Sequence, residues 1–182
     1  NFVSMAVNSV SLALTASVGI TLIAWLLAYT KRMYPSPLNN SLIRVSTIGY
    51  SLPGILLAVA LLMPLGAVNH WLVEIWPNST DAIFTGGVFL LLYAYVCRFL
   101  TVAYQSLESG FTSISNDLDA AARTLGASTL GLSSRIHFPL LKRSILGACL
   151  LVFVDVMREL PATLILRPFN FNTLATHCLL YT

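Results

Sequence analysis

Four long apolar segments, separated by polar stretches, dominate the pattern of this chain. Residues 5–29 and 45–73 contain no Asp, Glu, Lys or Arg, residues 82–107 contain only Arg98, and residues 144–166 are apolar through their first half. A helix that crosses the hydrocarbon core of a bilayer needs about 20 predominantly apolar residues. The pattern therefore predicts an all-α fold, a polytopic helical membrane protein with about four spans and part of a fifth.

The polar stretch between the third and fourth apolar segments predicts a loop, at about residues 113–139, that folds into two short helices. Asn116 is a suitable N-cap for the first, and the acidic residues that follow it suit the positive end of a helix. A run of three alanines favours a helix with little bulk. Gly126 can adopt the left-handed conformation that ends it. Ser128 can cap the second helix, and Pro139 is tolerated in the first turn of the next span.

Composition and charge agree with this class. Hydrophobic residues make up 57% of the chain and charged residues 9%, which excludes an ordinary water-soluble domain. Most Lys and Arg residues fall in or beside the 31–44 and 104–143 loops, whereas residues 69–81 contain none. The positive-inside rule places the first two loops in the cytoplasm. The net charge of +3 is explained by this topology and indicates no nucleic-acid partner.

No linker, low-complexity tract or internal repeat divides the chain, so residues 1–182 are expected to form a single transmembrane domain. The sequence has no initiating Met and no basic n-region before its first apolar run. It stops at Thr182 without a basic terminus. We therefore expect this domain to be incomplete at both ends.

Polar residues inside the apolar segments need compensation. Residues 51–54 read Ser-Leu-Pro-Gly and should break or kink the second span, whose freed backbone groups must then be satisfied by neighbours or water. Arg98 can reach a headgroup if it lies near the membrane face. Asp155, Arg158 and Glu159 interrupt the fourth segment, where an ionised side chain costs about 2.5–3.5 kcal/mol. Their spacing predicts one shared helical face, on which the arginine neutralises one or both acids.

The loop resembles the EAA loop of ABC-importer permeases, whose pattern is Glu-Ala-Ala, Gly, Ile and Leu-Pro at the same intervals. In this chain the pattern reads Ala120, Ala121, Ala122, Gly126, Ile136, Phe138 and Pro139. Ala120 stands where the family has Glu, with Asp119 one position earlier, so the acidic contact is shifted or lost. Phe138 replaces Leu, which should preserve its apolar role.

The resemblance implies that the loop docks on a cytoplasmic ATP-binding cassette subunit and transmits its closure to the membrane helices. Asp119 and Arg123 are then the expected polar contacts. The residues implied in this coupling are Asp119, Ala120, Ala121, Ala122, Arg123, Gly126, Ile136, Phe138 and Pro139. The chain has no Walker-type phosphate-binding sequence, so it is expected to be a transport subunit without cofactor, whose ATP is hydrolysed by a separate partner.

Residues 158–176 resemble the segment that follows the EAA loop in the ferric-iron branch of binding-protein-dependent permeases. They begin Arg-Glu-Leu-Pro-Ala-Thr-Leu-Ile-Leu-Arg-Pro. The resemblance implies the second six-helix half of a permease in a bacterial inner membrane. Its partners would be the other permease half, ATP-binding cassette subunits and a periplasmic binding protein that delivers ferric iron. Thiamine, polyamine and phosphonate importers share much of this pattern and stay open.

The charged cluster of Asp155, Arg158 and Glu159 permits three interpretations. It could lie at the outer interface if the span is shorter than drawn, form a buried structural ion pair, or contact the transported solute. It could also serve an ion-coupled secondary transporter, because such proteins use intramembrane ionisable residues as relays. That alternative leaves the EAA-like spacing unexplained.

Overall fold

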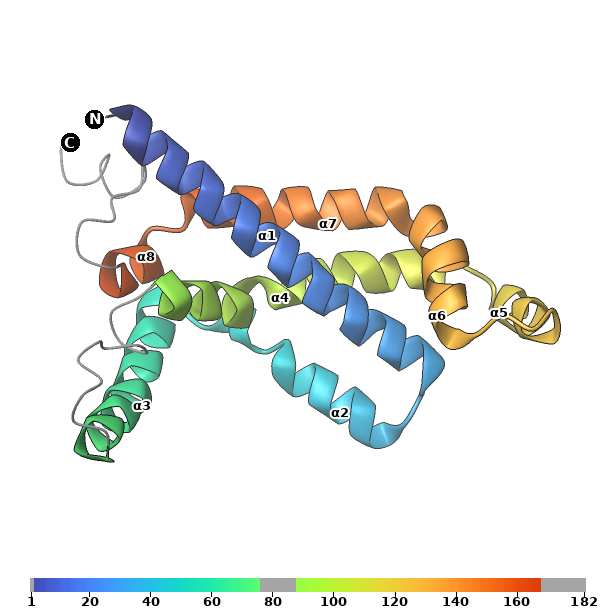
Figure 1. Cartoon of the computed structure of the whole chain (residues 1–182), viewed down its shortest axis with the longest axis horizontal. Helices are drawn as coiled ribbons and strands as arrows, with labels where there is room; N and C mark the ends of the chain where they lie inside the picture. The colour runs from blue at the N-terminus through green and yellow to red at the C-terminus, as the bar shows by residue number, and fades with distance from the viewer. Residues whose placement is uncertain (1, 76–87, 168–182) are drawn as a thin grey trace.

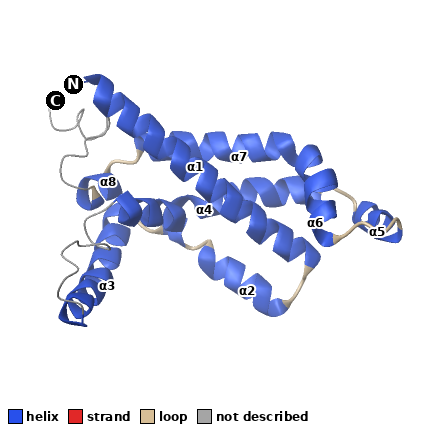
Figure 2. Ribbon diagram, viewed as in Figure 1, coloured by secondary structure: helices blue, strands red, loops and turns tan. Residues whose placement is uncertain are grey.

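The computed structural model describes residues 2–75 and 88–167, and these contain helices and no strand. The all-α fold predicted from the sequence is confirmed (Figure 2). The elements in chain order are α1 (Phe2–Met33), α2 (Pro37–Ser46), the 3-10 turn η1 (Gly49–Ser51), α3 (Gly54–Ile75), α4 (Val88–Thr112), α5 (Asn116–Thr124), α6 (Thr129–Leu132), the π-helical turn η2 (Ser133–His137), α7 (Phe138–Arg158) and α8 (Pro161–Leu166).

Three long helices, α1, α4 and α7, pack against one another and form the centre of the molecule (Figure 1). The short helices α5 and α6 lie at the end of this bundle where α1 and α4 finish and α7 starts. Helix α8 and the beginning of α3 lie at the opposite end. The loop that the sequence singled out is therefore held at one end of the bundle, and the charged cluster at the other.

The bundle packs through small side chains. Ala13, Ala24, Ala94, Ala103 and Ala148 are completely buried between the long helices. Lipid tails are as apolar as the side chains they surround, so there is little hydrophobic driving force for helices to associate in a membrane. Close backbone approach through small residues is instead a main source of helix association. Such packing lets small shifts of one helix reach its neighbours directly.

The number of continuous spans differs from the prediction. Among the described residues, α1 and α4 are long and apolar enough to cross a membrane. A third span results if the 37–51 and 54–68 helical segments, which meet at 117°, are counted as one broken span. The prediction of a continuous fourth span over residues 144–166 is wrong, since α7 ends at Arg158 and α8 begins at Pro161. Pro161 has no N–H to continue the hydrogen bonds of α7, and its ring would clash with the carbonyl four residues earlier in a continuous helix.

The break expected at residues 51–54 is present. Leu52 and Pro53 separate η1 from α3, which begins at Gly54 and leaves the bundle at a steep angle (Figure 1). The third apolar segment is helical from Val88, while residues 82–87 lie outside the described part of the chain. Residues 168–176 of the ferric-branch resemblance, and any part of a fifth span, also lie outside it.

Candidate coupling site

Helix α5 forms the tip of the loop. It is capped by Ser115, whose Oγ accepts a hydrogen bond from the backbone N–H of Asp117 at 3.1 Å. The predicted cap, Asn116, is wrong by one residue, because the hydroxyl one position earlier reaches the free N–H groups of the first turn. Beyond α5, Gly126 has φ of +82°, which confirms the predicted left-handed turn.

The second half of the loop leads directly into α7. Ser128 caps α6, as predicted, by accepting a hydrogen bond from the backbone N–H of Gly131 at 3.2 Å. The chain then passes through the π-helical turn η2, and Pro139 lies in the first turn of α7, also as predicted. A π-helical turn inserts extra residues into a helix and redirects its side chains. Here it places His137 in the interior, where the ring is completely buried.

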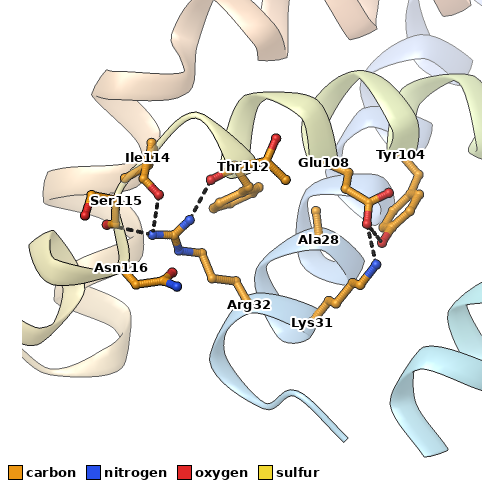
Figure 3. Close-up of a pocket in the computed structure, with 10 residues that line it drawn as sticks. Ala28, Lys31, Arg32, Tyr104, Glu108, Thr112, Ile114, Ser115 and Asn116 are labelled. Atoms are coloured by element: carbon orange, nitrogen blue, oxygen red, sulfur yellow. Dashed lines mark hydrogen bonds and ion pairs between the residues drawn. The ribbon is translucent and has the colours of Figure 1, made fainter. Parts of the chain in front are cut away.

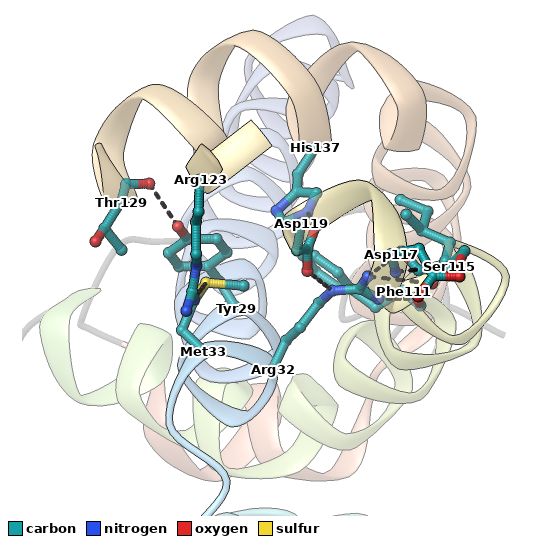
Figure 4. A network of polar contacts seen from close by, with 11 residues as sticks. Tyr29, Arg32, Met33, Phe111, Ser115, Asp117, Asp119, Arg123, Thr129 and His137 are labelled. Carbon is teal, nitrogen blue, oxygen red and sulfur yellow. Dashed lines mark hydrogen bonds and ion pairs between the residues drawn. The ribbon is translucent and has the colours of Figure 1, made fainter. Parts of the chain in front are cut away.

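Asp119 is the centre of a polar network at the base of the loop (Figure 4). Its Oδ2 accepts a hydrogen bond from Arg32 Nε at 2.7 Å, and its Oδ1 lies 2.8 Å from His137 Nε2. Because an ionised carboxylate only accepts, His137 donates from Nε2. Arg32 also donates to the backbone carbonyls of Phe111 at 2.6 Å, Ile114 at 3.1 Å and Ser115 at 3.1 Å. The network thus joins α1, the end of α4, α5 and η2.

The ionised form of Asp119 is favoured in this environment. Burial raises the pKa of the carboxyl, but hydrogen bonds from Arg32 and His137 and electrostatic attraction to these two groups outweigh burial and bring the pKa below its usual value. Both oxygens of the carboxylate are therefore engaged within this chain. A contact between Asp119 and an ATPase stays a prediction.

The last turns of α1 hold the remainder of the loop. The hydroxyl of Tyr29 donates to the backbone carbonyl of Thr129 at 2.5 Å, and Arg123 Nη2 lies 3.3 Å from Met33 Sδ. Ala122, one of the residues implied in coupling, is buried in a small cluster with Met33. Both short helices are thereby attached to the same end of α1.

The residues predicted for coupling divide by exposure. Asp119 and Ala122 are buried, and Ile136 is half-buried. The exposed ones are Ala120, Ala121, Arg123, Gly126, Phe138 and Pro139. The loop therefore offers its small residues on one face only, while its other face is occupied by α1 and η2.

Two leucines that the sequence analysis did not select form the apolar tip of the loop. Leu125 is 89% exposed and Leu130 is 82% exposed, on either side of the turn at Gly126. Leu125 ends α5 and Leu130 lies in α6, so each short helix displays one large apolar side chain. The signal was present in the sequence, since both leucines stand next to the turn residues of an otherwise polar segment.

A cavity of about 470 Å³ opens beside the network, between the ends of α1 and α4 (Figure 3). Lys31 forms an ion pair with Glu108 on one wall, where the Tyr104 hydroxyl also donates to Glu108 at 3.1 Å. Arg32 forms the opposite wall, with its guanidinium turned to the loop carbonyls. The two neighbouring basic residues of α1 thus point to different partners.

The second group of candidate residues lies at the other end of the bundle. Arg158 pairs with Asp155 within α7, as the spacing predicted. Glu159 does not share their helical face, because the helix has ended and its backbone is extended. It pairs with Arg98 of α4 instead, with 3.3 Å between Nε and Oε2. Arg98 therefore has a protein partner in place of the lipid headgroup that the sequence suggested.

Comparison with known proteins identifies the class. Residues 20–176 match the family described as binding-protein-dependent transport system inner membrane component. The chain belongs to this family. The membership accounts for the all-helical membrane fold, and a domain of this family is a transport component with no catalytic role of its own.

Two relatives of this transport component were found. One is the Fe(3+)-transport system permease protein FbpB 2 of Haemophilus influenzae, 26% identical over 48% of this chain and 17% of the relative. The other is the probable ABC transporter permease protein y4fN of Sinorhizobium fredii, 28% identical over 94% of this chain and 28% of the relative. The chain thus spans less than a third of the length of either protein.

Proposed function

We propose that this chain is part of the membrane-spanning permease of an ATP-driven importer in a bacterial inner membrane. Its loop of α5 and α6 docks on a cytoplasmic ATP-binding cassette subunit, and its long helices move a solute across by alternating access. A periplasmic binding protein delivers the solute, and a second permease half completes the path. Family membership and the ABC permease relative support this assignment.

One observation carries the proposal. The loop is braced on its inner face by Arg32 and His137 and presents Leu125 and Leu130 on its outer face. A surface that receives force from another protein needs an apolar contact and a rigid attachment. This loop has both, so closure of the ATPase would move α1 and α7 together.

Asp119 acts inside the protein in this proposal. It takes no part in the contact with the ATPase, because both carboxylate oxygens are engaged by residues of this chain. Ala120, Ala121, Arg123, Phe138 and Pro139 remain available to the partner by their exposure. The missing glutamate at position 120 is thus compatible with docking through small and apolar groups.

Ferric iron is the proposed solute. The support is the resemblance of residues 158–176 to the ferric-iron branch and the distant relative whose name specifies Fe(3+) transport. Thiamine, polyamines and phosphonates are the alternative cargoes. Uptake of each labelled solute by membrane vesicles, loaded with the matching binding protein, separates them directly.

Co-purification of the full-length protein with its ATP-binding cassette partner tests the docking. The variant carries Leu125→Arg and Leu130→Arg, which place charges on the exposed tip without disturbing the buried network. A Gly126→Trp variant is less suitable, because the left-handed backbone would be strained by any side chain. Leu38→Arg, which changes a leucine on α2 that is 70% exposed, is the control.

We expect the tip variant to lose the ATPase while it remains inserted in the membrane, and the control to retain it. Retention of the ATPase by the tip variant would show that this surface is not the docking site. Failure of the unaltered protein to bind any ATPase would remove the importer assignment itself.

A further inference from the structure

Two interrupted helices meet at the end of the bundle opposite the loop. The first interruption lies between η1 and α3 at residues 52–53, and the second lies between α7 and α8 at residues 159–160. In a membrane protein, every backbone group freed by such a break needs a partner within the protein. Arg98 and Glu159, which form an ion pair, supply one such partner at each break.

Each member of the pair serves one interruption. Arg98 Nη1 donates to the carbonyl of Leu52 at 3.0 Å, at the first break. Glu159 Oε1 accepts a hydrogen bond from the backbone N–H of Ala162 at 3.5 Å, at the second. The two charged groups are 3.3 Å apart, so both breaks are connected through one ion pair.

The pair is enclosed by close packing. The side chains of Arg98 and Glu159 are 19% and 8% exposed. A Cβ atom on Gly54 would lie 2.6 Å from Glu159 Oε1 and 2.9 Å from Arg98 Nη1, so the first break approaches the pair as closely as a backbone without a side chain allows.

A second chain of hydrogen bonds runs beside the ion pair, one turn away on α4. Thr163 Oγ1 donates to the carbonyl of Glu159 at 2.6 Å, and the hydroxyl groups of Tyr95 and Thr163 are 2.6 Å apart. Because the Thr163 hydrogen is used on Glu159, Tyr95 donates to Thr163. Helix α4 therefore holds α8 at two successive turns.

We propose that Arg98 and Glu159 are the positioning residues that fix both helix interruptions to α4, so that α3 and α8 move with α4 as one unit during transport. The inference rests on the proposed transport function. The pair is expected to determine how fast the transporter changes state, and not how well it engages the loaded binding protein. Both groups are already occupied by each other and by backbone, so neither is assigned as a solute ligand.

The test uses the full-length permease with its ATPase in proteoliposomes and measures the initial rate of solute uptake against the concentration of loaded binding protein. Glu159→Gln and Arg98→Gln each leave one buried charge without its counterpart. We expect either change to lower the maximal uptake rate about tenfold, since breaking a buried pair from one side is strongly destabilising. The concentration of binding protein that gives half-maximal uptake should stay within about twofold of the original, because the contact surface is unaltered.

The double variant with both changes decides whether the residues act together. It should transport about threefold faster than either single variant, because no unpaired charge is left and two amides can still hydrogen-bond. Lys31→Gln is the control. This lysine is also ion-paired, but its side chain and that of its partner Glu108 are both partly exposed, at 39% and 34%, so its loss should change the rate less than about twofold.

Three results would overturn the proposal: single variants that transport normally, a double variant slower than either single one, or a raised half-maximal concentration. If a single variant fails to insert, Glu159→Asp replaces it and should give a rate between those of the original and the double variant. Uptake by the unaltered protein tests the proposed transport function separately. If that uptake did not depend on ATP, the transport function would be contradicted, whatever the variants do.

Discussion

At both ends of the helical bundle an arginine binds backbone carbonyl oxygens and a carboxylate, but it makes more of these contacts at the loop end. At the loop end, Arg32 binds three backbone carbonyls and the carboxylate of Asp119, and His137 binds the same carboxylate. At the opposite end, Arg98 binds one backbone carbonyl and pairs with Glu159 at the longer distance of 3.3 Å. Each arginine thus satisfies carbonyls where a helix has ended.

The difference indicates where the molecule is rigid. The loop is attached through four elements at once, whereas the two interrupted helices depend on one ion pair and one hydroxyl chain. In the proposed function the loop receives the movement of the ATPase, so it needs the stronger attachment. The pair at the breaks has only to keep α3 and α8 together with α4.

The largest effect is expected from Arg32→Gln at the loop end. It leaves the buried carboxylate of Asp119 without its main partner and removes donors from three carbonyls. Breaking a buried pair in this way costs about 3–5 kcal/mol. The thermal unfolding of the purified full-length protein measures it. Lys31→Gln is the control, because its pair with Glu108 is partly exposed and worth less than about 1 kcal/mol. Equal losses for both variants would contradict the network.

A smaller effect is expected from Gly49→Ala at the opposite end. A Cβ atom there would lie 1.9 Å from the backbone carbonyl oxygen of Cys97, so η1 would have to move away from α4. Overpacking of this kind costs about 1–3 kcal/mol. Gly66→Ala in α3 is the matched control, because no atom lies within 4 Å of its Cβ position. Unfolding curves should separate the two variants. If Gly49→Ala were as stable as the control, η1 would not be in close contact with α4.

These contrasts also explain what could be predicted from the sequence. The cap at Ser128, the left-handed Gly126 and the helix start near Pro139 follow from residues within a few positions of each other, and all three were predicted. The pairing of Asp119 with Arg32 was not predicted, because Arg32 is 87 residues away in the chain. No local rule connects a basic residue at the end of one helix with an acid so far along.

The missed helix end at Arg158 has a different cause. Apolar length favoured one continuous span over residues 144–166, but Pro161 was already a signal against it. Once the helix ends, Glu159 turns from Arg158 to Arg98, which no spacing argument within one helix could have shown. Local signals thus predicted the elements, whereas the ion pairs depended on how the elements pack.

The smallest expected effect is the loss of stability at the loop end when the pH is lowered. The pKa of Asp119 is lowered in the folded protein, so its ionised form stabilises the fold above the unfolded pKa of about 3.9 and this stabilisation is lost as the pH falls through the lower folded value. The groups that face it are Arg32 and His137, with Tyr29 and Arg123 nearby.

Asp119→Asn should therefore be less stable than the original protein at neutral pH and approach it below about pH 4. Asp117→Asn, an exposed neighbour in the same turn, should keep the acid dependence of the original. Melting temperatures between neutral and acidic pH measure both, and a constant difference between Asp119→Asn and the original would show that the carboxylate does not brace the loop.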